Sequence, residues 1–146
     1  GRVAVRRGDG FHQPLESEHD SFVLGHTGTS ISLACGLAKT RDMQHTAAGA
    51  SEIGNVIAII GDGSLSSAIA FEGLNNAAEQ GGNLIIVVND NEMSIAEDFG
   101  GMYGNLARLR ASNGTAELNL FKRSDLTTVM WSRATMWTRW SRRLKT

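Results

Sequence analysis

Asp62 stands between two glycines, directly after the apolar run VIAII of residues 56–60. Asn91 lies 29 positions later, at the end of an Asn-Asp-Asn sequence that follows a second apolar run, LIIVV, at residues 84–88. A carboxylate repels a bound phosphate unless a divalent cation lies between them. Asp carboxylates, Asn amide oxygens and phosphate oxygens are ligands of a hard cation such as Mg²⁺. These residue types therefore predict a site for a cation and a phosphate.

Each motif taken alone has a simpler explanation. Asp and Gly are ordinary turn residues, so a single Gly-Asp-Gly is more often a turn than a metal site. The asparagines could equally be surface residues of a loop. The order of the parts favours the cation site, because a strand, a Gly-Asp-Gly turn, a helix, a second strand and an Asn-rich turn each have a separate physical task.

The elements that would position these residues form a strand-helix-strand unit. Residues 55–60 and 84–88 are short aliphatic runs without polar alternation, which predicts strands covered on both faces. Residues 64–80 predict a helix whose free N–H groups, starting at Ser64, would point at the phosphate. Such a crossover is nearly always right-handed and its strands are parallel, so both motifs are expected at the carboxyl edge of the sheet, where ligands bind.

A further helix is predicted over residues 29–41, and it would cover one face of the sheet. Its apolar stripe recurs at helical spacing: Ile31, Ala34, Cys35 and Ala38. Residues 43–54 are polar and contain glycine, which predicts a loop. The expected fold class is α/β, a doubly wound and mainly parallel sheet with helices on both faces.

Composition limits the class of protein. A chain of 146 residues with 41% hydrophobic content fits one domain with a real core. The apolar runs are too short to cross a bilayer, and the N-terminal GRVAVRRGDG lacks the apolar segment of a secretory signal. We therefore expect a cytoplasmic location and no membrane partner. The single cysteine, Cys35, excludes an internal disulfide and is expected to be a small core residue rather than a reactive thiol.

Residues 122–146 differ in composition from residues 1–121. They carry seven of the fourteen Lys and Arg, only one of the fifteen Asp and Glu, and all three tryptophans, without clear helical or strand periodicity. We therefore place a boundary at residue 122. A shifted reading frame would explain the abrupt change. A cationic arm that binds nucleic acid or an anionic membrane is the alternative, less favoured because its basic residues define no single face.

The segment GDGSLSSAIAFEGLNNAAEQGGNLIIVVNDNEMSIA, residues 61–96, resembles the thiamine-diphosphate motif of transketolase-like enzymes. With GHTGTSIS at residues 25–32 and LESEHDSF before it, the chain is similar to the 1-deoxy-D-xylulose-5-phosphate synthase family in particular. The resemblance covers residues 10–121 and is specific, because separated motifs occur in the right order. It implies that residues 1–121 are part of a diphosphate-binding domain.

The resemblance also implies which residues would hold the cofactor. The Mg²⁺ ligands would be a carboxylate, an amide and a backbone carbonyl: Asp62, Asn91 and Met93. The remaining contacts to thiamine diphosphate would come from Gly25, His26, Thr27, Gly63 and Ser64. His26 would lie over the diphosphate or near the reactive ring, although an isolated histidine more often has a structural role.

In the whole enzyme, the resemblance implies that thiamine diphosphate adds to pyruvate and, after loss of CO₂, the carbanion attacks glyceraldehyde 3-phosphate. The product, 1-deoxy-D-xylulose 5-phosphate, is a precursor of isoprenoids and thiamine. The family is a transferase, and a homodimer is implied for the full-length enzyme. Its activating glutamate belongs to a second domain, so the chain alone is expected to turn over nothing. Two alternatives stay open: one subunit of a split transketolase-type enzyme, or a non-catalytic remnant.

Overall fold

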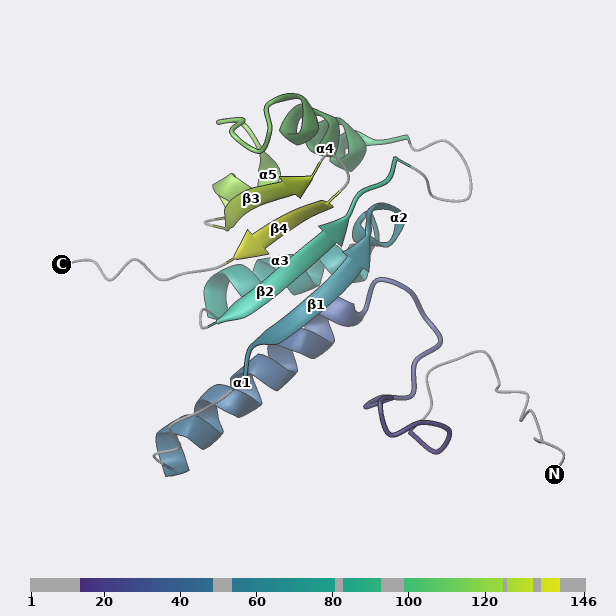
Figure 1. Ribbon diagram of the computed structural model, residues 1–146, viewed down its shortest axis with the longest axis vertical. Coiled ribbons are helices and arrows are strands. Elements are labelled where there is room, and N and C mark those ends of the chain that lie inside the picture. The colour runs from purple at the N-terminus through teal and green to yellow at the C-terminus, as the bar shows by residue number, and fades with distance from the viewer. Residues whose placement is uncertain are drawn as a thin grey trace, which may run out of the picture.

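The computed structural model describes residues 14–48, 54–80, 83–92, 99–124, 126–132 and 135–139 (Figure 1). The helices are α1 Ser30–Ala48, α2 Asp62–Leu65, α3 Ala68–Gln80, α4 Gly101–Ala111 and α5 Leu120–Arg123. The strands are β1 Val56–Gly61, β2 Leu84–Asn89, β3 Thr127–Ser132 and β4 Thr135–Arg139. Among the described residues, no helix is long and apolar enough to span a membrane.

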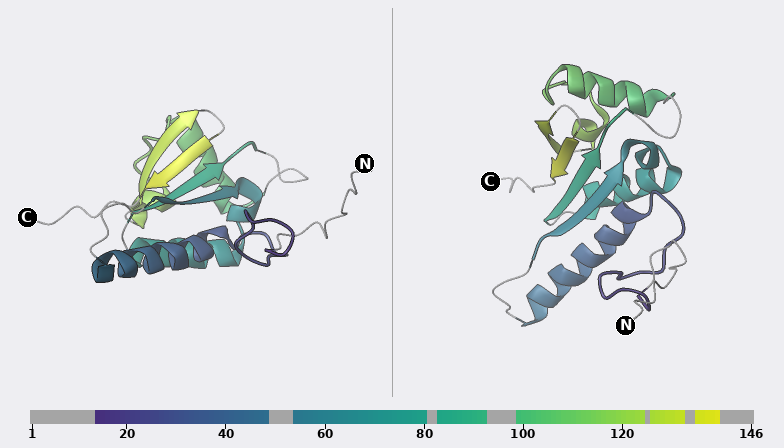
Figure 2. Two further views of the ribbon diagram at one scale, coloured as in Figure 1. Left: turned by 60° about the horizontal axis from the view of Figure 1, so that its bottom comes forward. Right: turned by 45° about the vertical axis from the view of Figure 1, so that its right-hand side comes forward.

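The predicted strand-helix-strand unit is confirmed. β1 and β2 are parallel, in register from Val56 opposite Leu84 to Gly61 opposite Asn89. Helices α1 and α3 pack against each other on the same side of the sheet, and α1 contacts both strands (Figure 2). The apolar stripe predicted for α1 is buried in the core, and so are the inward residues of the two strands: Ala58, Ile60, Leu84, Ile86 and Val88. The α/β class is therefore confirmed, as an incomplete fold.

Strand β1 is covered on one face only, so the prediction of cover on both faces is wrong for this strand. Ile57 and Ile59 are 55% and 67% exposed, whereas Ala58 and Ile60 between them are buried. Successive side chains of a strand point to opposite faces. Because α1 and α3 share one side of the sheet, the face of β1 that carries Ile57 and Ile59 stays open.

Two helix boundaries also differ from the prediction. Helix α1 continues to Ala48, into residues expected to form a loop. The helix expected over residues 64–80 is two helices, because the chain turns at Ser66 and Ser67. The hydroxyl of Ser67 accepts a hydrogen bond from the backbone N–H of Ala70 (3.2 Å), which is the capping geometry that starts a new helix.

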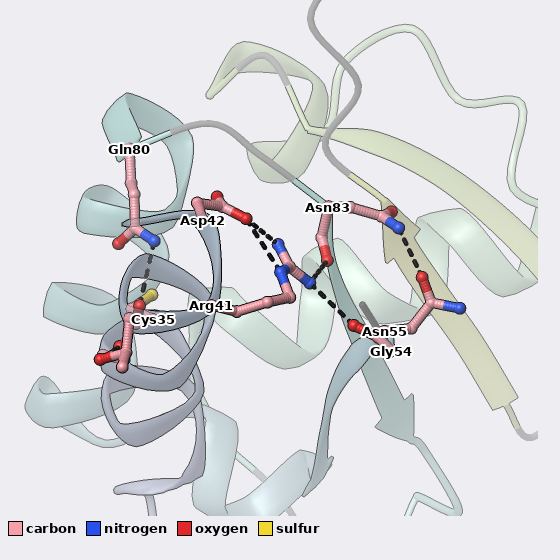
Figure 3. Close-up of polar contacts among 9 residues, drawn as sticks. Cys35, Arg41, Asp42, Gly54, Asn55, Gln80 and Asn83 are labelled. Atoms are coloured by element: carbon pink, nitrogen blue, oxygen red, sulfur yellow. Dashed lines mark hydrogen bonds and ion pairs between the residues drawn. The ribbon is translucent and has the colours of Figure 1, made fainter. Parts of the chain in front are cut away.

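The starts of β1 and β2, opposite the candidate site, are joined to α1 by polar contacts (Figure 3). The guanidinium of Arg41 donates to the carbonyl oxygens of Asn83 (2.8 Å) and Gly54 (3.5 Å), and it forms an ion pair with Asp42 (2.7 Å). The amide of Asn83 donates to Oδ1 of Asn55. These contacts fix the start of both strands against the helix.

Residues 122–146, which carry the basic composition, do not form a free arm along their described length. β4 pairs antiparallel with β2, and β3 pairs antiparallel with β4, which gives the strand order β1-β2-β4-β3. The expectation that this stretch lacks regular structure is therefore wrong for residues 127–132 and 135–139. Strand formation depends on the neighbouring strand as well as on local periodicity, and β2 supplies that neighbour. Helices α4 and α5 lie beside this hairpin, away from α1 (Figure 1).

Candidate cation and phosphate site

The ends of β1 and β2 bring two acidic residues together. Gly61 and Asn89 form the last pair of the parallel ladder, so Asp62 and Asp90 follow at the same edge of the sheet. Their relative exposures are only 3% and 2%. Burial is the main cause that raises the pKa of Asp90, and the charge of Asp62 adds a smaller rise. The predicted convergence of the two strand ends is present.

The carboxylate of Asp62 is only half satisfied. Its Oδ1 accepts a hydrogen bond from the backbone N–H of Gly63 (2.9 Å). Its Oδ2 is buried and has no hydrogen-bond partner in the described part of the chain. A buried carboxylate oxygen without a partner is costly, and a divalent cation is the kind of group that would satisfy it. The donor at this position therefore fits Mg²⁺.

Asp90 forms an ion pair with a side chain of the protein, Arg110. The guanidinium of Arg110, on α4, donates to Oδ2 of Asp90, and the Nε of Arg110 pairs with Glu92 at 2.8 Å. Burial raises the pKa of Asp90, while Arg110 and the backbone N–H of Glu92 lower it in part. Of the two acidic residues, Asp62 is therefore the one with an oxygen left for a metal.

Asn91 lies between Asp90 and Glu92 in the sequence and is exposed. Glu92 has a positive φ of 62°, which marks a tight turn after β2. Met93, the third predicted ligand, lies outside the described residues. Within those residues, no group of three or more His, Cys, Asp and Glu could hold a metal ion. The mixed set of a carboxylate, an amide and a carbonyl remains a prediction.

The segment that carries Gly25, His26 and Thr27 lies against the turn between α2 and α3. Gly28 follows with a φ of +88°, and a Cβ at Gly28 would lie 2.2 Å from Oγ of Ser67 and 3.3 Å from the carbonyl oxygen of Ser64. Only glycine allows this approach. The structure thereby places the predicted Gly-His-Thr segment next to the predicted diphosphate segment, two regions separated by more than 30 positions in the sequence.

Three of the predicted cofactor contacts are exposed, namely Gly25, His26 and Thr27. The Nδ1 atom of His26 lies 2.5 Å from the carbonyl oxygen of Thr27, and the hydroxyl of Thr29 donates to the carbonyl oxygen of His26 (3.2 Å). The ring of His26 is thus held beside its own backbone and remains accessible.

Gly63 and Ser64 are half-buried within α2. The predicted helix start at Ser64 is wrong, because α2 starts at Asp62 after Gly61 and has four residues. A carboxylate at the first position of a helix accepts from the backbone N–H groups that have no partner within the helix. The N–H of Gly63, expected to face the diphosphate, donates to Asp62 in this structure.

Sequence reasoning missed two positions of the site. Arg110 lies 20 residues after Asp90 on a helix without a recognisable motif, so no local signal identifies it. Gly28 does have a signal, because it belongs to the quoted GHTGTS stretch, and a glycine there indicates a close approach of the backbone. The partner of that approach, Ser67, could be found only from the fold.

A family model described as 1-deoxy-D-xylulose-5-phosphate synthase matches residues 5–146. The chain is 48% identical over 101 residues to a 1-deoxy-D-xylulose-5-phosphate synthase of Pelotomaculum thermopropionicum, and 50% identical over 101 residues to one of Heliobacterium modesticaldum. Each alignment covers 69% of this chain and 15% of the relative. For a synthase of Nitratidesulfovibrio vulgaris, the identity is 50% over 72 residues, 49% of this chain and 10% of the relative. The chain thus spans a small part of the length of these relatives.

Proposed function

Because the chain belongs to the 1-deoxy-D-xylulose-5-phosphate synthase family, we propose that it binds thiamine diphosphate through Mg²⁺. The observation that carries this proposal is the buried Oδ2 of Asp62, which has no partner within the described residues and lies at the carboxyl edge of a parallel strand pair. Ligands of open α/β sheets bind at this edge. A cation there would link the protein to an anionic diphosphate.

We assign the residues of the chain the following tasks. The carboxylate of Asp62, the amide of Asn91 and the backbone carbonyl of Met93 bind Mg²⁺. The remaining contacts to the diphosphate and the ring come from Gly25, His26, Thr27, Gly63 and Ser64. The role of His26 rests on its place in the Gly-His-Thr segment, which lies against the turn that follows Gly63 and Ser64. The bound cofactor supplies the carbon that adds to pyruvate.

In the whole enzyme, we propose that this site serves the transfer of a two-carbon unit from pyruvate to glyceraldehyde 3-phosphate, with loss of CO₂. Such an enzyme would be a cytoplasmic, homodimeric transferase in the synthesis of isoprenoid and thiamine precursors. The aligned segments of the chain cover only 10–15% of the relatives named above. We therefore expect cofactor binding without turnover from the chain alone.

Isothermal titration calorimetry with thiamine diphosphate, with and without Mg²⁺, tests this proposal. We expect saturable binding that needs Mg²⁺, and no release of CO₂ from pyruvate. Absence of any metal-dependent heat would overturn the proposal and favour a non-catalytic remnant. Recovery of carboligation on adding a copurifying chain that carries a pyrimidine-binding domain would instead identify one subunit of a split enzyme.

A further inference from the structure

Helix α4 contacts the Asp62 side of the candidate site. The hydroxyl of Tyr103 donates to Oγ of Ser66 (3.1 Å), and the hydroxyl of Ser66 donates to the carbonyl oxygen of Gly63 (2.8 Å). Two hydrogen bonds therefore connect α4 to the residue that follows Asp62. The connection joins positions 37 residues apart in the sequence.

The same helix also contacts the Asn91 side. Arg110 pairs with Asp90 and with Glu92, the two residues that flank Asn91. Arg110 is seven positions after Tyr103, which is two helical turns, so both side chains lie on the same side of α4. The Arg110 side chain is only 20% exposed, which limits the competition of water for its ion pair with buried Asp90.

Helix α4 is itself fixed to the core. Leu106 and Leu109 have no exposed surface, and Oδ1 of buried Asn105 accepts a hydrogen bond from the backbone N–H of Leu120 (2.8 Å). A helix held in this way is a rigid support for the two polar side chains that it presents. The Asp62 and Asp90 carboxylates repel each other, and the charge of Arg110 offsets that repulsion.

We propose that α4 sets the geometry of the cation site, with Tyr103 and Arg110 as positioning residues that hold the Asp62 side and the Asn91 side at a fixed separation. Arg110 also keeps Asp90 paired, so that Asp62 remains the carboxylate that faces the metal. The inference rests on the proposed function, since it concerns the ligands of the same Mg²⁺ and diphosphate.

The test compares Mg²⁺-dependent affinity for thiamine diphosphate, by calorimetry, in the wild-type chain, Arg110→Met and the matched control Arg108→Met. Arg108 is exposed on the same helix and has no carboxylate partner in the described part of the chain. Arg110→Met should weaken the affinity at least tenfold, because the turn that carries Asn91 loses its support and Asp90 becomes an unpaired negative charge beside an anionic ligand. Arg108→Met should stay within twofold of the wild type.

Three further variants separate positioning from folding. Arg110→Lys keeps the charge beside Asp90 but lacks the planar fork that reaches Glu92, so it should recover part of the lost affinity. Tyr103→Phe should cost a few-fold, because only the Ser66 contact is removed. Glu92→Gln weakens only the 66% exposed partner of Arg110, and it should also cost a few-fold while the melting temperature stays unchanged.

The outcomes distinguish this inference from the proposed function. If the wild type binds with Mg²⁺ and Arg110→Met binds equally well, the positioning role is overturned and the site stands. Equal losses in Arg108→Met and Arg110→Met would also overturn it, since they would indicate general damage to α4.

If Arg110→Met does not fold, wild-type affinity in both Glu92→Gln and Tyr103→Phe would decide against the inference. If the wild type itself shows no metal-dependent binding, the proposed function falls and this inference falls with it.

Discussion

Cys35 and Asp62 are both buried, yet their burial has different consequences. The Sγ atom of Cys35 packs in the core and donates weakly to the carbonyl oxygen of Gly73 (3.7 Å). A thiol behaves there as a small apolar group, which confirms the role predicted from its apolar neighbours. A carboxylate needs hydrogen bonds or a cation, and Oδ2 of Asp62 has no hydrogen bond within the described residues. The same degree of burial is therefore satisfied by packing at Cys35, whereas at Asp62 it leaves an oxygen for the proposed cation.

Cys35 gives a pH dependence of stability. Burial raises the pKa of its thiol, and a hydrogen bond with Asn76 lowers it only in part. The folded chain therefore holds this proton at pH values where the unfolded chain releases it, so the free energy of unfolding falls as the pH rises above the ordinary thiol pKa of about 8.5. Urea unfolding of the wild type and Cys35→Ala between pH 7 and pH 10 measures this. The stability difference between the two chains should change with pH, and a constant difference would contradict the assignment.

At the scale of elements, the close contact between α1 and α3 depends on a glycine, Gly73. A Cβ at Gly73 of α3 would lie 3.0 Å from two carbons of Ile31 and from Oγ of Ser32. Gly73→Ala should destabilise the chain by about 1 kcal/mol, because overpacking a core costs roughly 1–3 kcal/mol and outweighs the gain in helix propensity. Gly36→Ala on α1 is the matched control, since nothing lies within 4 Å of its Cβ position. It should stabilise by about 0.5–1 kcal/mol.

Urea unfolding of these two variants measures the difference directly. Equal stabilisation by both alanines would show that the helices are further apart than the structure has them.

The elements themselves were largely predictable, whereas their ends were not. Apolar runs and helical spacing identified α1, α3, β1 and β2, because burial follows the local period. The turn at Ser66 and Ser67 could not be predicted from the sequence. A serine is compatible with a helix surface, and it starts a new helix only when its hydroxyl caps one. β3 and β4 were not predicted for another reason: the pairing of β4 with β2, and of β3 with β4, is a tertiary contact that composition does not encode.

The candidate site was also predictable only in part. The residues at the ends of β1 and β2 follow from the rule that parallel strands end at one edge. The ion pair of Asp90 with Arg110 does not follow, because it depends on where α4 lies in the folded chain. Long-range pairs of this kind need the fold first.

At the scale of the whole molecule, the open face of β1 predicts self-association. Ile57 and Ile59 are largely exposed, and β1 is an edge of the described sheet. Exposed apolar edge strands pair with other chains unless they are protected. Sedimentation velocity of the isolated chain should show concentration-dependent dimers or larger species. The double variant Ile57→Thr and Ile59→Thr should reduce them, because threonine keeps the strand propensity and removes apolar surface.

Leu118→Thr is the control for that measurement, since Leu118 is 55% exposed outside β1. It should leave the association unchanged. A monomeric wild type at every concentration, or an equal effect of the control, would contradict the role of the β1 face.

The most direct test of the cation site is a titration of thiamine diphosphate, with and without Mg²⁺, on the wild type, Asp62→Ala, Asp62→Asn and the control Asp42→Ala. Asp42 is a carboxylate at the opposite end of the sheet, paired with Arg41. Both Asp62 variants should lose the metal-dependent part of the affinity, while Asp42→Ala keeps it and all four chains fold by circular dichroism. Unchanged metal-dependent binding in folded Asp62→Ala and Asp62→Asn would contradict the account.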